Sequence, residues 1–132
     1  MWTALPIFTS TGITSIENQD IITGTYIKIG RAVHINAYLR SDGIAKSGTA
    51  AVYISNLPFS PDDGEYFSVE VGFVGAWAGD HPDGGYIDGT DSRIVLVHRG
   101  ASDGASSTIN AADLSTADNA NKIMFSATYF TD

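Results

Sequence analysis

Segment 80–91 holds four carboxylates in twelve residues, and carboxylates are the groups that calcium binding and acid–base chemistry need. Clustered carboxylates can supply the six to eight oxygens that calcium requires. The candidate ligands are Asp83, Asp88 and Asp91, although their spacing is not that of an EF-hand. The alternative is a solvated loop with two Asp-Gly turns, because this dipeptide strongly favours turns. We favour the turns and expect no metal.

Aromatic residues flank the same segment and suggest a second chemistry, the binding of a sugar ring. Aromatic side chains beside carboxylates can hold a ring by stacking and hydrogen bonding, and binding residues often lie in loops on a rigid scaffold. The candidate receptor-binding residues are Trp77, Asp80, His81, Asp83 and Tyr86. The competing interpretation places Trp77 at the end of a core strand and Tyr86 at the start of another.

Catalysis has little support in the sequence. The histidines are His34, His81 and His98, and the first and last fall inside alternating strands, where a packing or interface role is typical. No serine stands in a Gly-x-Ser-x-Gly elbow, and the histidine spacing matches no helical zinc motif. Paired carboxylates for glycoside cleavage could be drawn from segment 80–91, but sequence alone does not give their separation. We therefore expect a non-enzymatic protein without a cofactor.

The composition excludes several classes of partner. The 132 residues carry a formal charge of −8 without a basic cluster, which disfavours nucleic acid. The sequence contains no run of eighteen apolar residues that would predict a membrane-spanning helix, and residues 1–6 lack the features of a signal peptide. There is no cysteine, so thiol chemistry and disulfides are excluded.

The rest of the sequence, which must position these groups, predicts short strands separated by turns. β-branched residues are abundant, which favours strands over helices. Asp-Gly turns are expected at five places: Asp42-Gly43, Asp63-Gly64, Asp83-Gly84, Asp88-Gly89 and Asp103-Gly104. Strands are predicted over 23–29, 31–40, 49–55, 66–77, 92–99 and 122–130, with a short strand at 86–87 and a helical turn within 109–120.

Alternation assigns the faces of three of these strands. The inward sets are Val33, Ile35, Ala37 and Leu39; Phe67, Val69, Val71 and Phe73; and Ile123, Phe125, Ala127 and Tyr129. Gly72 and Gly75 would permit a bulge. The opposite faces would carry Tyr38, Val52, Val95, Val97, Met124 and Phe130. These are more apolar than a solvated face usually is, which suggests self-association.

Together these patterns predict an all-β, antiparallel fold, a β-sandwich or jelly roll, as one domain over residues 1–132. Turns at short and regular spacing, without a helix long enough to cross over a sheet, favour antiparallel pairing.

Three stretches carry a resemblance to a known family: residues 24–33, 54–59 and 123–129. In this order they resemble the β-rich C-terminal module of bacteriophage tail fibre and tailspike proteins and of other small phage virion proteins, and Trp2-Thr3 with Gly12-Ile13-Thr14 is similar to its opening. The matching motif residues are Tyr26, Lys28, Gly30, Leu57, Pro58, Phe59 and Tyr129. The resemblance implies a homotrimer in the virion, with these residues in structural roles.

Three functions follow as expectations. The first is a receptor-binding head that presents loops 60–65, 78–91 and 100–108 to a host-surface glycan or protein, where three weak sites would act together. The second is a capsid decoration or head-fibre protein that attaches to the virion. The third, a glycan-cleaving tailspike enzyme, lacks a catalytic constellation.

Overall fold

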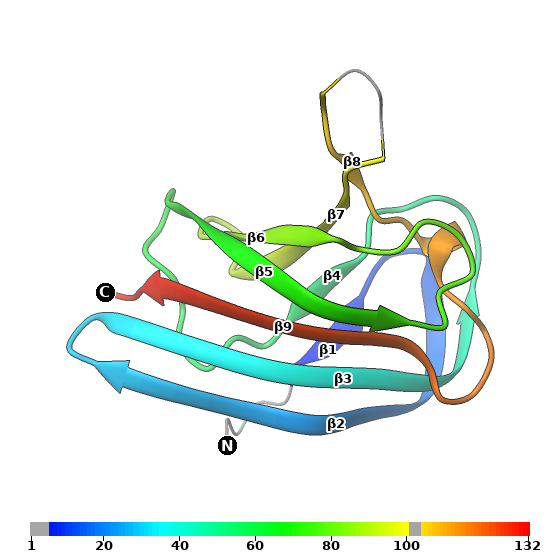
Figure 1. Ribbon diagram of the computed structural model, residues 1–132, viewed down its shortest axis with the longest axis horizontal. Coiled ribbons are helices and arrows are strands. Elements are labelled where there is room, and N and C mark those ends of the chain that lie inside the picture. Colours follow the sequence, from blue (N-terminus) through cyan, green and yellow to red (C-terminus); the bar gives the residue numbers. More distant parts are fainter. Residues whose placement is uncertain (1–5, 101–103) are drawn as a thin grey trace.

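The computed structural model describes residues 6–100 and 104–132, and nearly all of its regular structure is strand (Figure 1). The strands are β1 Ile7–Thr9, β2 Ile13–Ile29, β3 Ala32–Lys46, β4 Tyr53–Ser55, β5 Tyr66–Gly75, β6 Gly84–Asp88, β7 Arg93–His98, β8 Ser107–Thr108 and β9 Ala120–Phe130. One 3₁₀ turn, Ala111–Asp113, lies in the segment where a helical turn was predicted. No helix in the described part of the chain is long and apolar enough to cross a membrane.

All strand pairs are antiparallel, so the predicted all-β antiparallel architecture is confirmed. The order is β1-β4-β7-β6-β5-β9-β3-β2, with β8 attached to β7. Hydrogen bonds link the described strands into one sheet, where the sandwich prediction expected two. The sheet curls until its ends approach each other, and the Phe8 N–H donates to Gln19 Oε1 across the seam at 3.2 Å. The result is a nearly closed, barrel-like sheet.

The hairpin of β2 and β3 turns where the sequence predicted, at Gly30-Arg31. Ile29 pairs with Ala32, and Gly30 has a φ of +59°, which glycine adopts without strain. Both strands are much longer than predicted. Asp42-Gly43 lies inside β3, so the turn predicted there is wrong. Gly43 also has a φ of +59°, and the strand continues through this irregularity because it remains paired with β2.

The other Asp-Gly pairs divide between turns and a strand start. Asp63-Gly64 forms a turn, and Gly89 begins the turn between β6 and β7, as predicted. Gly84 instead starts β6, so no turn separates it from the strand. Asp103 lies outside the described residues.

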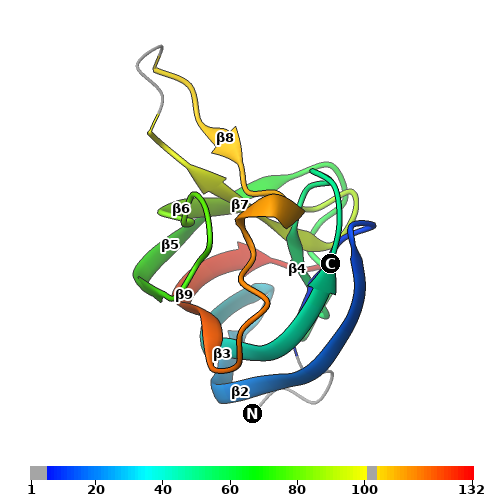
Figure 2. The ribbon, with the colours of Figure 1, turned by 90° about the vertical axis from the view of Figure 1, so that its right-hand side faces the viewer.

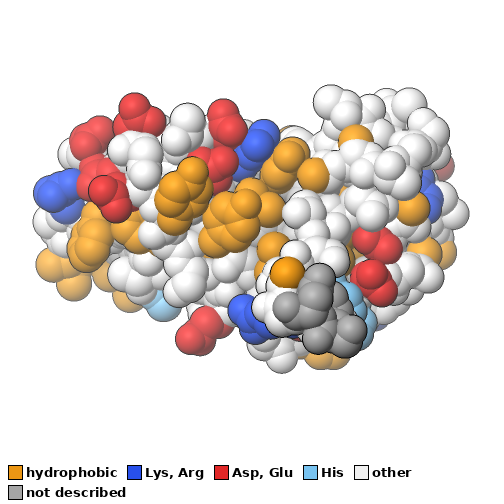
Figure 3. Space-filling model, turned by 90° about the horizontal axis from the view of Figure 1, so that it is seen from above, with side chains coloured by type: hydrophobic (Ala, Val, Ile, Leu, Met, Phe, Trp, Pro, Cys, Tyr) orange, Lys and Arg blue, Asp and Glu red, His pale blue; other side chains and the backbone are white. Residues whose placement is uncertain are grey.

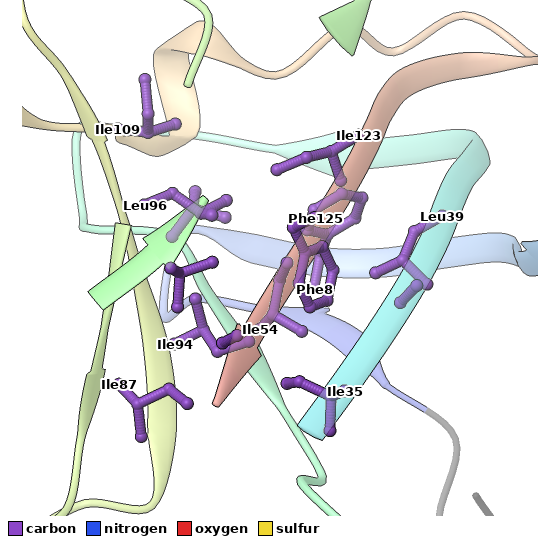
Figure 4. Close-up of a cluster of buried hydrophobic side chains, with 14 of the residues drawn as sticks. Phe8, Ile35, Leu39, Ile54, Ile87, Ile94, Leu96, Ile109, Ile123 and Phe125 are labelled. Atoms are coloured by element: carbon purple, nitrogen blue, oxygen red, sulfur yellow. The ribbon is translucent and has the colours of Figure 1, made fainter. Parts of the chain in front are cut away.

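The core fills the inside of the curled sheet (Figure 4). Side chains from opposite walls meet there, and the largest fully buried ones are Tyr129, Phe8, Phe125, Ile35, Leu39, Ile44, Ile54, Ile87, Ile94, Leu96 and Ile109. The inward faces predicted for residues 33–39 and 123–129 are confirmed, since all eight side chains are buried. Burying one such Ile or Phe contributes roughly 1.5–3 kcal/mol, so this set stabilises the fold.

Strand β5 changes face at Gly72. The register against β9 shifts between Val71 and Phe73, which is the bulge that Gly72 was expected to permit. Because a bulge inserts one residue, the residues after it exchange sides. Phe73 is 46% exposed, so its predicted inward position is wrong, and Val74 packs against the core instead.

The predicted outward apolar set is half correct. Met124 and Phe130 are exposed and Tyr38 is half-buried. Val52, Val95 and Val97 are buried, so their outward exposure was wrongly predicted. Val52 joins the core, Val95 lies opposite Tyr53 and Tyr86 in the neighbouring strands, and Val97 lies between Gly84 and Thr108. Large cross-strand neighbours such as Tyr53 and Tyr86 flank this face of β7.

Strand β8 and the chain beside it project from the body of the sheet (Figure 2). Val97 pairs with Thr108 and His98 with Ser107, so the base of this projection continues the β7 ladder. It stands at the end of the sheet that also carries the segment between β5 and β6.

Candidate functional site

Trp77 is bound into the structure rather than displayed by a loop. Its indole N–H donates to the Lys122 carbonyl at 2.9 Å, and its ring meets the Phe8 ring edge to face, with centroids 5.9 Å apart. It is half-buried against the core. These contacts fit the competing interpretation, in which Trp77 ends a core strand.

Three of the other candidates, Asp80, His81 and Asp83, gather around His98 at the end of β7. His98 Nδ1 lies 2.9 Å from the His81 carbonyl oxygen and 3.6 Å from Asp83 Oδ2, while Nε2 lies 3.9 Å from Asp80 Oδ1. The two imidazole rings meet edge to face at 5.3 Å. His98 was predicted only as a strand residue, because nothing in the sequence shows that β7 brings it beside segment 80–83.

Asp83 has a defined structural role in this cluster. Both of its carboxylate oxygens accept from the Arg99 backbone N–H at 3.1 Å. A Cβ added at Gly84 would lie 2.5 Å from the Arg99 guanidinium, so glycine allows the two chains to approach here. The cluster therefore fastens segment 80–83 to the end of β7, and its polar groups are largely occupied by one another.

The calcium candidates are not brought together. Asp83 directly precedes the five-residue strand β6 and Asp88 is its last residue, so the two stand roughly 17 Å apart at about 3.3 Å per residue. Asp88 Oδ1 accepts from the Thr90 N–H at 3.0 Å, and Asp91 pairs with Arg93 at 3.1 Å. No group of three or more metal-binding side chains in residues 6–100 and 104–132 is placed to hold an ion.

Tyr86 is exposed and belongs to a different part of the surface. It lies on β6, where a short strand was predicted, and its ring meets that of Tyr66 edge to face at 6.0 Å. Tyr66 is 64% exposed. The pair lies nearer to the turn at Gly89 than to the histidine cluster. That turn packs against segment 62–65. Loops 60–65 and 78–83 thus lie at opposite ends of the sheet and do not form one contact surface.

A group of polar side chains on the outer face of three adjacent strands was not among the predicted site residues. We call it the polar strip, and its members are His34 and Asn36 on β3, Ser126 and Thr128 on β9, and Ser68 and Glu70 on β5. Register places them in two rows, since His34 pairs with Thr128, Asn36 with Ser126, and Ser126 with Glu70. His34 Nδ1 lies 3.0 Å from Thr128 Oγ1. A hollow of about 250 Å³ opens between these residues.

Two aromatic pairs border the polar strip along the strand direction. Tyr66 and Tyr86 stand toward one end, and Tyr38 and Phe73 at the other, each pair with ring centroids 6.0 Å apart. Alternation does place His34 and Asn36 opposite the core. It does not say which strands lie beside them, so the strip could not be assembled from the sequence.

The motif residues from separate stretches converge at the hairpin end of the core. Tyr26 and Phe59 meet edge to face at 5.3 Å, and Lys28 Nζ lies 5.4 Å from the Phe59 ring centroid. The Tyr129 hydroxyl donates to the Phe59 carbonyl at 2.8 Å and accepts from its N–H at 3.3 Å. Burial raises the pKa of Tyr129 to about 12, against a smaller lowering by the Phe59 backbone bond. Leu57 packs on the core, and Pro58 follows the end of β4.

Arg31 ties the same hairpin to the C-terminus. Its Nε donates to the Thr131 carbonyl at 3.0 Å, and its guanidinium pairs with Asp62. A hydrogen bond with Asp132 lowers the pKa of Asp62 and raises that of Asp132, because the two carboxyls share one proton most readily when only one is charged. Trp2-Thr3, part of the resemblance, lies outside the described residues.

The chemistry of the surface is thus a polar strip between aromatic pairs and a histidine–aspartate cluster with internal bonds. In the polar strip the Thr128 hydroxyl lies beside the His34 imidazole, and among the described residues no second side chain forms a hydrogen bond with that ring to orient it. Comparison with protein-family models, with curated proteins and with solved structures finds no match for the chain.

Proposed function

We propose that the chain is a non-enzymatic bacteriophage virion protein, the trimeric head of a tail fibre or spike, which binds a glycan or protein on the host cell surface. The proposal begins from the sequence resemblance. Its motif residues meet around Phe59, where they join the β2–β3 hairpin, the segment after β4 and the last strand. A shared packing role is a physical reason for these residue types to occur together.

The observation that carries the proposal is a set of large hydrophobic side chains exposed at the hairpin end of the outer face. We call it the apolar patch, and its members are Ile27, Ile29, Tyr66 and Phe130, with exposed fractions of 62, 76, 64 and 50%. Figure 3, which views the molecule from the side of β5 to β8, also shows hydrophobic side chains gathered over the hairpin half, with acidic side chains beside them. Exposed apolar groups of this size favour association with another protein surface.

The edge of the sheet supports self-association at the same place. Strand β2 is the last in the strand order, so its hairpin half has a partner only on the β3 side within the described chain. A long unpaired edge with exposed Ile27 and Ile29 is a surface that proteins normally cover. Three copies around a threefold axis would bury it by a heterologous contact that closes on itself.

The proposal keeps the jelly-roll-like description of each protomer and the absence of catalysis. Two walls of strands around one core support the first. The absence of catalysis is supported by the histidine–aspartate cluster, whose hydrogen bonds hold segment 80–83 in place. Asp83 accepts from the Arg99 N–H, and His98 Nδ1 bonds to the His81 carbonyl.

Retention of fluorescently labelled protein on susceptible bacterial cells tests the proposal, with its mass in solution measured alongside. We expect a trimer and saturable retention. A monomer, or a protein held by no susceptible strain, contradicts the receptor-binding head. Retention only on phage particles that lack the protein would support capsid decoration or head-fibre attachment instead.

A further inference from the structure

The polar strip offers a binding surface that lies away from the predicted loops. We propose that it binds a neutral oligosaccharide, which lies along β3, β9 and β5 between the two aromatic pairs. This inference rests on the proposed receptor binding and names the class of receptor and the face that holds it.

The strip is hollowed rather than flat. The 250 Å³ hollow between His34, Glu70 and Thr128 adjoins one of about 190 Å³ that reaches Asn36 and Met124. A third, of about 450 Å³, shares Ser68 and Glu70 and extends to Asp83 and Arg99. Glu70 lines all three hollows, which we together call the trough.

Most polar groups of the strip are available to a ligand. His34 and Thr128 bond to each other, whereas Asn36, Ser68, Glu70 and Ser126 have no protein partner for their side chains among the described residues. These groups include hydroxyls and an amide that both donate and accept, and a carboxylate that accepts. A ligand with many hydroxyls matches them, because each hydroxyl can donate to one group and accept from another.

Charge and shape narrow the ligand class further. Glu70 is the only permanently charged member of the strip, and Asp83 and Arg99 at the far end of the trough carry opposite charges. Since the chain carries a net charge of −8, an anionic polymer is disfavoured. The centre of the strip is polar, which disfavours an apolar peptide. The aromatic pairs at its ends supply faces on which sugar rings can stack, and side chains on paired strands are held in place before binding.

A titration of the full chain, labelled with ¹⁵N, tests the inference by NMR. The probes are neutral hexasaccharides of the dextran, malto, cello and chito series at millimolar concentration, with hexagalacturonate as the anionic comparison. We expect at least one neutral probe to shift amide signals of β3, β5 and β9 around the strip, and hexagalacturonate to leave them unchanged.

Two variants and a matched control make the test specific. Ser68→Arg places a long side chain in the trough and should abolish the shifts, and Glu70→Gln should weaken the affinity about tenfold, because it removes charge-assisted hydrogen bonds. Ser15→Arg is the control, since Ser15 is also an exposed strand serine but lies on β2 outside the strip. Dispersed spectra for all three would show that each has folded.

Shifts with no neutral probe, shifts confined to segments 80–83 and 98–99, or preference for hexagalacturonate would each overturn the inference. Cell retention separates it from the function proposed above. If cells hold Ser68→Arg as well as the unaltered chain, the strip is not the receptor site although the head function stands. If a neutral probe binds the strip but no susceptible cell holds the protein, the receptor-binding function fails and the sugar site remains.

Discussion

The inner and outer faces of β3 and β9 use alternate residues of the same strands for different purposes. Inward-facing Ile35 and Phe125 are 0% and 1% exposed and belong to one continuous core. Outward-facing His34 and Ser126 line a polar hollow. Successive side chains point to opposite sides of a strand. The inward-facing residues can therefore supply the folding free energy while the outward-facing residues remain free to vary. Stability and surface chemistry should therefore respond to different substitutions.

Substituting neighbouring residues of β9 gives the largest expected contrast. Phe125→Ala removes a fully buried ring and leaves a cavity, which should lower the free energy of unfolding by about 3–5 kcal/mol. Ser126→Ala, one residue later, should change it by less than about 0.5 kcal/mol. Urea denaturation followed by tryptophan fluorescence measures both. Equal losses in the two variants would show that the faces are not energetically separate.

The bulge offers a way to exchange the faces within one strand. Inserting one alanine between Gly72 and Phe73 moves the rest of the strand by one position, so Phe73 should turn inward opposite Ile123 and Val74 outward. The larger ring must then enter space that valine occupies, at a cost of about 1–3 kcal/mol. The same denaturation experiment measures the loss, and ¹⁵N–¹H spectra should show changes concentrated in β5 and β9. An insertion variant as stable as the parent would mean that a second bulge absorbs the added residue.

The sequence predicted the elements whose alternation is uninterrupted. Residues 33–39 and 123–129 read as period-two strands, and their inward side chains are buried. It failed where irregularities occur inside a strand. Asp42-Gly43 is a strong turn signal, yet β3 passes through it because pairing with β2 continues, and Phe73 changes side because the bulge at Gly72 adds one residue.

The candidate site was less predictable because it depends on which strands are neighbours. Asp80, His81 and Asp83 were chosen by their closeness in sequence, and they do gather, but around His98 from another strand. Asp88 is also close in sequence and lies at the far end of β6. The strip around Glu70 joins residues from three strands, and only the pairing of β3, β9 and β5 unites them.

Tyr129 belongs to the inner face and should make stability depend on pH at high pH. Its pKa is about 12 in the folded protein, against 10.0 for a free tyrosine side chain, so the unfolded chain loses the phenol proton first. The stabilisation is complete below pH 10 and is lost as pH rises toward 12. Urea midpoints measured between pH 9 and about pH 12 should fall over this range.

Tyr129→Phe is the control for that pH dependence. It should reduce the fall between pH 10 and 12, while the loss of the hydrogen bonds to Phe59 lowers the free energy of unfolding by about 1 kcal/mol at neutral pH. If the variant and the parent lose stability in parallel above pH 10, ionisation of Tyr129 is not the cause.

The smallest effect on folding is expected in the apolar patch, where Ile27→Thr combined with Ile29→Thr keeps β-branched residues on the strand. Both side chains are mostly exposed, so the free energy of unfolding of one protomer should change by less than about 0.5 kcal/mol. Light scattering after size-exclusion chromatography should nevertheless show a shift from trimer toward monomer, because these side chains form the surface proposed to lie between copies. Thr14→Ser, at an exposed position on β2 away from the patch, is the control and should leave the mass unchanged. A trimer that persists in the double variant would place the contact elsewhere on the outer face. A parent chain that is already monomeric would mean that self-association does not explain the exposed isoleucines.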